Sequence, residues 1–117
     1  LIDGGKQTTA SFMSGTTPIP ANKPDIAMAT AMAGEMLGLK IIYMDAGSGA
    51  DNPVHPEIIK RVSASVSVPV IVGGGIKTRA ALEGALSAGA DVAVVGNVLE
   101  QDPDFLNVIA ELNLSLA

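Results

Sequence analysis

The feature that most constrains the fold of this 117-residue chain is a unit that recurs along it: a short apolar run ends in glycine, and a helical segment follows. The clearest apolar runs are residues 41–44, 70–72 and 92–95. They are continuously apolar rather than alternating, which is typical of strands buried on both faces of a parallel sheet. We therefore predict consecutive βα units.

Helix punctuation supports this reading. Pro24 and Pro56 suit first helical positions and Thr78 suits an N-cap, which predicts helices over 24–37, from 56, and from 78 to about 88. A fourth helix begins near residues 102–104. The inner faces are expected to carry Ile26, Ala29, Met32, Ala33 and Met36 of the first helix, Ile58, Ile59, Val62 and Val66 of the second, and Phe105, Val108, Ile109 and Leu112 of the fourth.

Residues 1–2 then form the stub of a further strand, and residues 4–22 a long loop, so that the chain holds about four βα units. Four parallel strands leave bare edges, which further strands must cover. We predict an α/β fold in which residues 1–117 are the C-terminal half of a single (βα)8, TIM-barrel-like domain. An open flavodoxin-like sheet is the alternative. The barrel is favoured because chemically capable residues gather where successive strands end.

Composition excludes several function classes. Twelve acidic against seven scattered basic residues give a net charge of −5, which argues against binding to nucleic acid or an anionic membrane surface. The absence of cysteine excludes disulfides, thiolate metal sites and a cysteine nucleophile, and fits a cytoplasmic protein. Neither a Walker A nor a Gly-x-Gly-x-x-Gly pattern is present.

Two glycine-rich strand ends predict a phosphate site. Gly73-Gly74-Gly75 precedes the helix capped by Thr78, and Gly96-Asn97 ends the next strand. Glycines expose backbone N–H groups, and the nearby helix N-terminus favours an anion. A single glycine at such a place merely makes a tight turn. Two such strand ends in succession favour phosphate binding.

Residues 43–49 place a phenol, a carboxylate and a hydroxyl in one short stretch. Tyr43 and Asp45 share one side of the strand. If that side faces the barrel interior, Asp45 accepts hydrogen bonds from substrate hydroxyls while Ser48 and backbone amides approach the phosphate. Alternatively, Asp45 stabilises a turn and Tyr43 is a core side chain.

The histidine, the methionines and the basic residues are more simply explained by structural roles. His55 precedes Pro56 and suits a helix start better than a catalytic base. The row Met28, Met32 and Met36 is expected to pack against the sheet or a partner subunit, with a lipid-chain groove as the weaker alternative. Lys77 and Arg79 lie beside the triple glycine, where they either contact an anion or, as the default, belong to the solvated surface. The same two interpretations stay open for Lys6 and Lys23.

Three stretches carry a resemblance to a known family: residues 43–50, residues 70–76, and residues 88–91 leading to Gly96-Asn97. The chain resembles the geranylgeranylglyceryl phosphate synthase family through essentially its whole length, including Thr17-Pro18-Ile19-Pro20 and Lys23-Pro24. The resemblance implies a modified (βα)8 barrel. It also implies an enzyme that joins a polyprenyl diphosphate to the terminal hydroxyl of sn-glycerol 1-phosphate, forming an ether-lipid precursor.

The same resemblance implies the site residues. Those expected to bind sn-glycerol 1-phosphate are Tyr43, Met44, Asp45, Ala46, Gly47, Ser48, Gly49, Gly74, Gly75, Gly96 and Asn97. Asp45 would be the catalytic residue, which orients the glycerol hydroxyls and helps to deprotonate the attacking one. Many family members carry Glu where this chain has Asp45.

The family's Mg²⁺ ligands belong to early strands that this chain does not include, so no metal ligand is predicted here. This stretch alone is therefore expected to be inactive and to need the N-terminal half of the barrel. The family is commonly oligomeric, which implies a homo-oligomer. Two other readings stay open: a different sugar-phosphate barrel enzyme, and a non-catalytic phosphate-binding half barrel.

Overall fold

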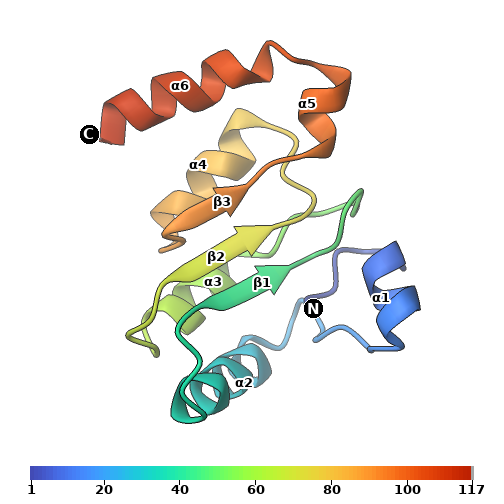
Figure 1. The fold of residues 1–117 in the computed structure, drawn as a ribbon, viewed down its shortest axis with the longest axis vertical. Helices are drawn as coiled ribbons and strands as arrows, with labels where there is room; N and C mark the ends of the chain where they lie inside the picture. Colours follow the sequence, from blue (N-terminus) through green and yellow to red (C-terminus); the bar gives the residue numbers. More distant parts are fainter. Residues whose placement is uncertain (117) are drawn as a thin grey trace.

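A parallel sheet of three strands organises the molecule, as the computed structural model, which describes residues 1–116, shows in Figure 1. The strands are β1 (Ile42–Asp45), β2 (Val70–Gly73) and β3 (Val92–Val94), and they lie in the order β1-β2-β3. Ile42 pairs with Val70, and Ile71 with Val92. Spatial order equals chain order, as it does along the strands of a parallel β/α barrel.

Helices pack on one face of this sheet. α3 (Pro56–Ser63) and α4 (Arg79–Ser87) connect the strands and lie behind the sheet in Figure 1, and α2 (Pro24–Met36) precedes β1 and packs on α3. α5 (Asn97–Gln101) and α6 (Phe105–Leu116) follow β3, and α1 (Thr9–Ser14) lies near the chain's beginning. The connections between strands therefore have the βαβ form that the sequence predicts.

The core lies between the sheet and the helices. Ile58, Ile59 and Val62 of α3 are completely buried against Val70 and Val72 of β2. A second cluster joins α4 and α6 through Leu82, Phe105 and Leu112. The residues predicted for the inner faces of the second and fourth helices are thus buried or partly buried.

The opposite face of the sheet is open. Tyr43, Val92 and Val94 are 50%, 48% and 44% exposed, since none of the described residues covers them. The expectation of strands buried on both faces is therefore wrong for residues 1–116 taken alone. In a closed β/α barrel this face is the packed interior, which is why its side chains are apolar although exposed here.

The predicted inner face of the first helix is also wrong. Ala27 and Ala31 are buried, whereas Met36 is 86% exposed. Ile26 and Met32 are exposed too, whereas Met28 is partly buried, so Met32 and Met36 do not pack against the sheet. Packing of this row against a partner subunit stays a prediction. The small side chains of Ala27 and Ala31 belong to the core where α2 packs on α3.

Several local expectations can now be checked. Pro24 and Pro56 begin helices, and Thr78 caps α4 by accepting the N–H of Ala81 at 3.2 Å. His55 has the helix-start role, because its Nδ1 accepts the N–H of Glu57 at 3.2 Å.

Three expectations need correction. The predicted loop over residues 4–22 contains a helix, α1, whose N-terminus is capped by a capping box between Thr8 and Ser11. The short helix α5, after β3, was not predicted either. Instead of a strand, Ile2 makes one isolated bridge, to Ile19, and its N–H donates to the Asp45 carbonyl oxygen at 2.9 Å. Within residues 1–116 there are therefore three strands rather than four. In the same residues no helix has the length and apolar character needed to cross a membrane.

Ile59→Ala should lower the free energy of unfolding by about 2–5 kcal/mol, because it leaves a cavity at a fully buried position. Lys60→Ala, on the exposed side of the same helix, should stay within about 0.5 kcal/mol of the parent. Urea unfolding measures both. Equal effects at the two positions would contradict the assigned core face of α3.

Candidate phosphate site at the carboxyl ends of the strands

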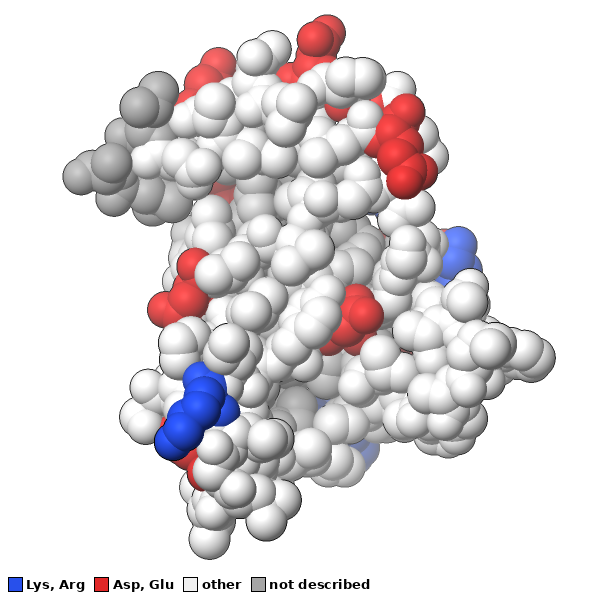
Figure 2. Space-filling model, in the orientation of Figure 1, with Lys and Arg blue, Asp and Glu red and all other residues white. Residues whose placement is uncertain are grey.

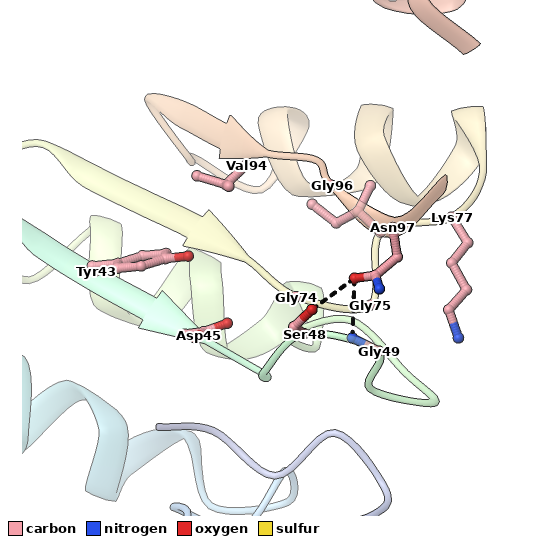
Figure 3. Close-up of a pocket in the computed structure, with 11 residues that line it drawn as sticks. Tyr43, Asp45, Ser48, Gly49, Gly74, Gly75, Lys77, Val94, Gly96 and Asn97 are labelled. Atoms are coloured by element: carbon pink, nitrogen blue, oxygen red, sulfur yellow. Dashed lines mark hydrogen bonds between the residues drawn. The ribbon is translucent and has the colours of Figure 1, made fainter. Parts of the chain in front are cut away.

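An open cavity of about 140 Å³ lies where the three strands end (Figure 3). The loops after β1, β2 and β3 each contribute to it. Its lining residues are Tyr43, Asp45, Ser48, Gly49, Gly74, Gly75, Ile76, Lys77, Val94, Gly96 and Asn97. The carboxyl ends of parallel strands are where β/α barrels bind their ligands.

The glycine turn after β2 packs backbone against backbone on the loop after β1. Gly74 and Gly75 have φ values of +80° and +70°, which side-chain-bearing residues rarely adopt. A Cβ on Gly74 would lie 2.6 Å from the Gly47 nitrogen, and one on Gly75 would lie 2.5 Å from the Asn52 carbonyl oxygen. Both glycines are thus required by local structure, and the same lack of side chains opens their amides to the cavity.

Gly73 has a different role. A Cβ there would lie 2.5 Å from the Tyr43 hydroxyl, so glycine makes room for the phenol to lie across the end of β2. The triple glycine therefore combines one position that admits Tyr43 with two that admit the neighbouring loop.

Several backbone donors at this edge of the sheet are free for a ligand. Within residues 1–116, the N–H groups of Gly74, Gly75, Gly96 and Asn97 have no intramolecular acceptor. α4, whose first residue is Arg79, begins just beyond the glycine turn, so its dipole adds positive potential there. Such a set of N–H groups is suited to an anion with several oxygens.

Asp45 and Tyr43 lie on the open face of β1, as their spacing predicts. The Oδ1 atom of Asp45 accepts the Gly47 N–H at 2.8 Å, so the turn-stabilising role is real. Asp45 also lines the cavity, and its Oδ2 makes no hydrogen bond or ion pair within the described residues. The two interpretations of Asp45 are therefore compatible, since each uses a different oxygen.

Partial burial against the sheet, and secondarily the charge of Asp45, raise the pKa of Tyr43 above its usual value. The phenol accordingly stays protonated at neutral pH, where it is a hydrogen-bond donor. A donor and an acceptor thus stand side by side on β1, which is what binding a hydroxyl group requires.

Lys77 is a candidate that the sequence offered only as the weaker alternative to solvated surface. It lines the cavity, and no ion pair among residues 1–116 includes it. Arg79, by contrast, pairs with Glu83 and Glu111 at 2.8 and 2.7 Å and does not line the cavity. Figure 2 shows that basic side chains on the open face of the molecule are isolated, so one lysine beside an anion site matters. Its place two residues after Gly75 was the available signal.

The structure brings most of the predicted site residues together and leaves three outside. Met44 and Ala46 are buried in the core, and a Cβ added at Gly47 would collide with the Thr8 side chain. These three residues shape the loop without lining the cavity. The two predicted residues after β3, Gly96 and Asn97, both line it.

The described residues do not fit a magnesium ion. Residues 1–116 contain no cluster of three or more His, Cys, Asp or Glu side chains that could hold a metal, and Asp45 is the single carboxylate of the cavity lining. Mg²⁺ favours several oxygen ligands in octahedral geometry. The chemistry assigned to these residues below therefore involves no metal.

Fold and site together define the class: this is part of a parallel β/α barrel with a ligand cavity at the carboxyl ends of its strands. Residues 3–113 match the PcrB family. The chain belongs to that family.

Similar proteins include curated relatives named geranylgeranylglyceryl phosphate synthase. The relative from Spirosoma linguale is 53% identical over 120 residues, covering 99% of this chain and 48% of the relative. The one from Thermococcus kodakarensis is 46% identical, covering 86% and 39%. The chain thus spans about half the length of the curated relatives it matches.

Among solved structures, (S)-3-O-geranylgeranylglyceryl phosphate synthase from Thermoplasma acidophilum, in complex with its substrate sn-glycerol-1-phosphate, superposes with a TM-score of 0.80. It is 32% identical, and the match covers 86% of this chain and 41% of that one. The strands described above are therefore part of the same barrel fold.

Gly74→Ala should lower the free energy of unfolding by about 1–3 kcal/mol, because alanine is strained at this φ and its Cβ meets backbone. Gly84→Ala in α4, where an added Cβ meets nothing within 4 Å, should instead stabilise by about 0.5–1 kcal/mol. Thermal unfolding of both variants measures the contrast. A neutral Gly74→Ala would show that the two loops do not need their close contact.

Proposed function

We propose that this chain supplies the glycerol-phosphate site of a prenyltransferase that joins a polyprenyl diphosphate to sn-glycerol 1-phosphate. The observation that carries the proposal is the cavity itself, which has backbone donors and Lys77 in one part and Asp45 with Tyr43 in the other. The names of the relatives, and the substrate bound to the Thermoplasma acidophilum enzyme, support the same assignment.

The polar groups of the cavity form two sets, and each set suits a different end of the substrate. A phosphate dianion offers only acceptors, so it suits the free amides of Gly74, Gly75 and Gly96 and the ammonium group of Lys77. The glycerol hydroxyls both donate and accept, so they suit the Asp45 carboxylate and the Tyr43 phenol. This arrangement selects a small phosphorylated alcohol.

The proposed chemistry is a substitution at carbon. The terminal hydroxyl of the glycerol attacks the first carbon of the prenyl chain, and a C–O bond forms while the bond to diphosphate breaks. Diphosphate leaves with the electron pair, and Asp45 accepts the hydroxyl proton. A positioned carboxylate of this kind acts as a general base.

The Mg²⁺ that the resemblance implies is assigned to residues outside the stretch described here, because the cavity lining lacks the ligands. The prenyl diphosphate site is assigned there as well. We also infer a cytoplasmic, homo-oligomeric protein. Sedimentation of the protein extended to the length of its relatives tests the oligomeric state.

The experiment for the proposed function is an assay of the extended protein with a prenyl diphosphate, Mg²⁺ and each enantiomer of glycerol phosphate. Product is expected from sn-glycerol 1-phosphate and little from sn-glycerol 3-phosphate. A folded protein that forms product from neither enantiomer would overturn the proposal. Tight binding of sn-glycerol 1-phosphate without product would favour a non-catalytic phosphate-binding barrel.

Asp45→Asn should lower kcat by about 10²- to 10⁴-fold, since an amide cannot accept the hydroxyl proton. The fold should be kept, because the amide oxygen can still accept the Gly47 N–H. Asp51→Asn is the matched control, since Asp51 lies in the loop that follows Asp45 but does not line the cavity. Asp51 forms an ion pair with Lys6 at 3.1 Å. Near-normal kcat for Asp45→Asn would reduce Asp45 to a turn residue.

A further inference from the structure

We propose that Asn97 is a positioning residue that uses both ends of its amide: the oxygen holds the loop after β1 across the cavity, and the NH₂ group donates to the phosphate. The second part of this proposal, donation to the phosphate, rests on the proposed function, whereas the loop contact does not. Sequence reasoning assigned Asn97 to substrate binding without distinguishing the two ends.

The loop contact consists of two hydrogen bonds to one atom. The Ser48 hydroxyl donates to Asn97 Oδ1 at 2.9 Å, and the Gly49 N–H donates to the same oxygen at 3.2 Å (Figure 3). A backbone N–H can only donate, so the atom that faces Gly49 must be the amide oxygen. The orientation of the Asn97 amide is thereby determined, and its Nδ2 makes no hydrogen bond within the described residues.

These bonds join the ends of two strands that are not neighbours in the sheet. β2 lies between β1 and β3, and Gly49 and Asn97 are 48 residues apart in the chain. Within residues 1–116, no other side-chain hydrogen bond links the loop after β1 to the end of β3. Gly47 and Ala50, on either side of this segment, are buried, whereas a Cβ added at Gly49 would meet nothing within 4 Å and Ser48 is exposed. Asn97 contacts the segment between the two buried residues.

The contact also determines which donors remain for an anion. The Gly49 N–H and the Ser48 hydroxyl proton are committed to Asn97, so they are unavailable to phosphate oxygens while the loop is held. The donors that remain in the lining include the Nδ2 group of Asn97, the ammonium group of Lys77 and the free backbone amides described above. The Ser48 oxygen keeps lone pairs and suits a glycerol hydroxyl instead of the phosphate.

Two substitutions separate the two ends of the amide. Asn97→Asp keeps an oxygen that can accept from Ser48 and Gly49, but it replaces the donating NH₂ by a negatively charged oxygen. Asn97→Ala removes both ends. Asn107→Asp is the matched control, because it adds the same charge on the exposed side of α6, away from the cavity.

The measurements are the dissociation constant for sn-glycerol 1-phosphate by calorimetry and amide hydrogen exchange of residues 47–50, on the extended protein. Asn97→Asp should exchange like the parent and bind at least about tenfold more weakly. Asn97→Ala should exchange faster in this loop and also bind more weakly. Asn107→Asp should match the parent in both.

Kinetics give a further test that a merely structural role would not pass. Asn97→Asp should raise the KM for sn-glycerol 1-phosphate while kcat stays within about threefold of the parent, because Asp45 is untouched. A fall in kcat and in thermal stability with an unchanged KM would overturn the donor role. Parent-like exchange and affinity in Asn97→Ala would overturn the loop contact.

Failure of the proposed function would look different. If the parent binds inorganic phosphate but not sn-glycerol 1-phosphate, the ligand assignment is wrong. The Asn97 proposal then stands or falls with the exchange of residues 47–50 and with phosphate affinity, measured on the same three variants. An Asn97→Asp variant that binds either ligand as the parent does would overturn the donor end outright.

Discussion

The candidate site depends on one close contact, in which the glycine turn after β2 lies directly on the loop after β1. Gly74 and Gly75 reach left-handed conformations and leave no space for a side chain against Gly47 and Asn52. Because backbone meets backbone, the two loops bring their amides and the Asp45 carboxylate to one cavity. Any side chain at the turn would separate the loops and remove both the packing and the free donors.

Around this contact the structure places groups with complementary chemistry. Free amides and Lys77 provide positive potential in a chain whose net charge is −5, so attraction for an anion is local rather than global. Asp45 uses one oxygen for its own turn and presents the other to the cavity. A residue type that usually indicates either a turn or a catalytic group can therefore serve as both, because a carboxylate has two acceptor atoms.

Much of the fold followed from local chemistry. Pro24, Pro56 and Thr78 mark helix starts because a missing N–H or an accepting hydroxyl is useful only in the first turn. The apolar runs before Gly73 and Gly96 predicted parallel strands within one or two residues. The inward face of α2 could not be predicted in this way, since hydrophobicity favoured Met36 whereas the packing of α2 on α3 buries Ala27 and Ala31.

The sequence by itself determined the βα order of the chain, the glycines at the strand ends and the shared face of Tyr43 and Asp45. These depend on dihedral preferences and on the two-residue period of a strand, which act over a few residues. Only the tertiary structure decided that Lys77 lines the cavity, that Met44 and Ala46 do not, and that Asn97 holds Ser48 and Gly49. Those outcomes require residues tens of positions apart to meet, and the sheet register and loop packing that bring them together are set by the whole core.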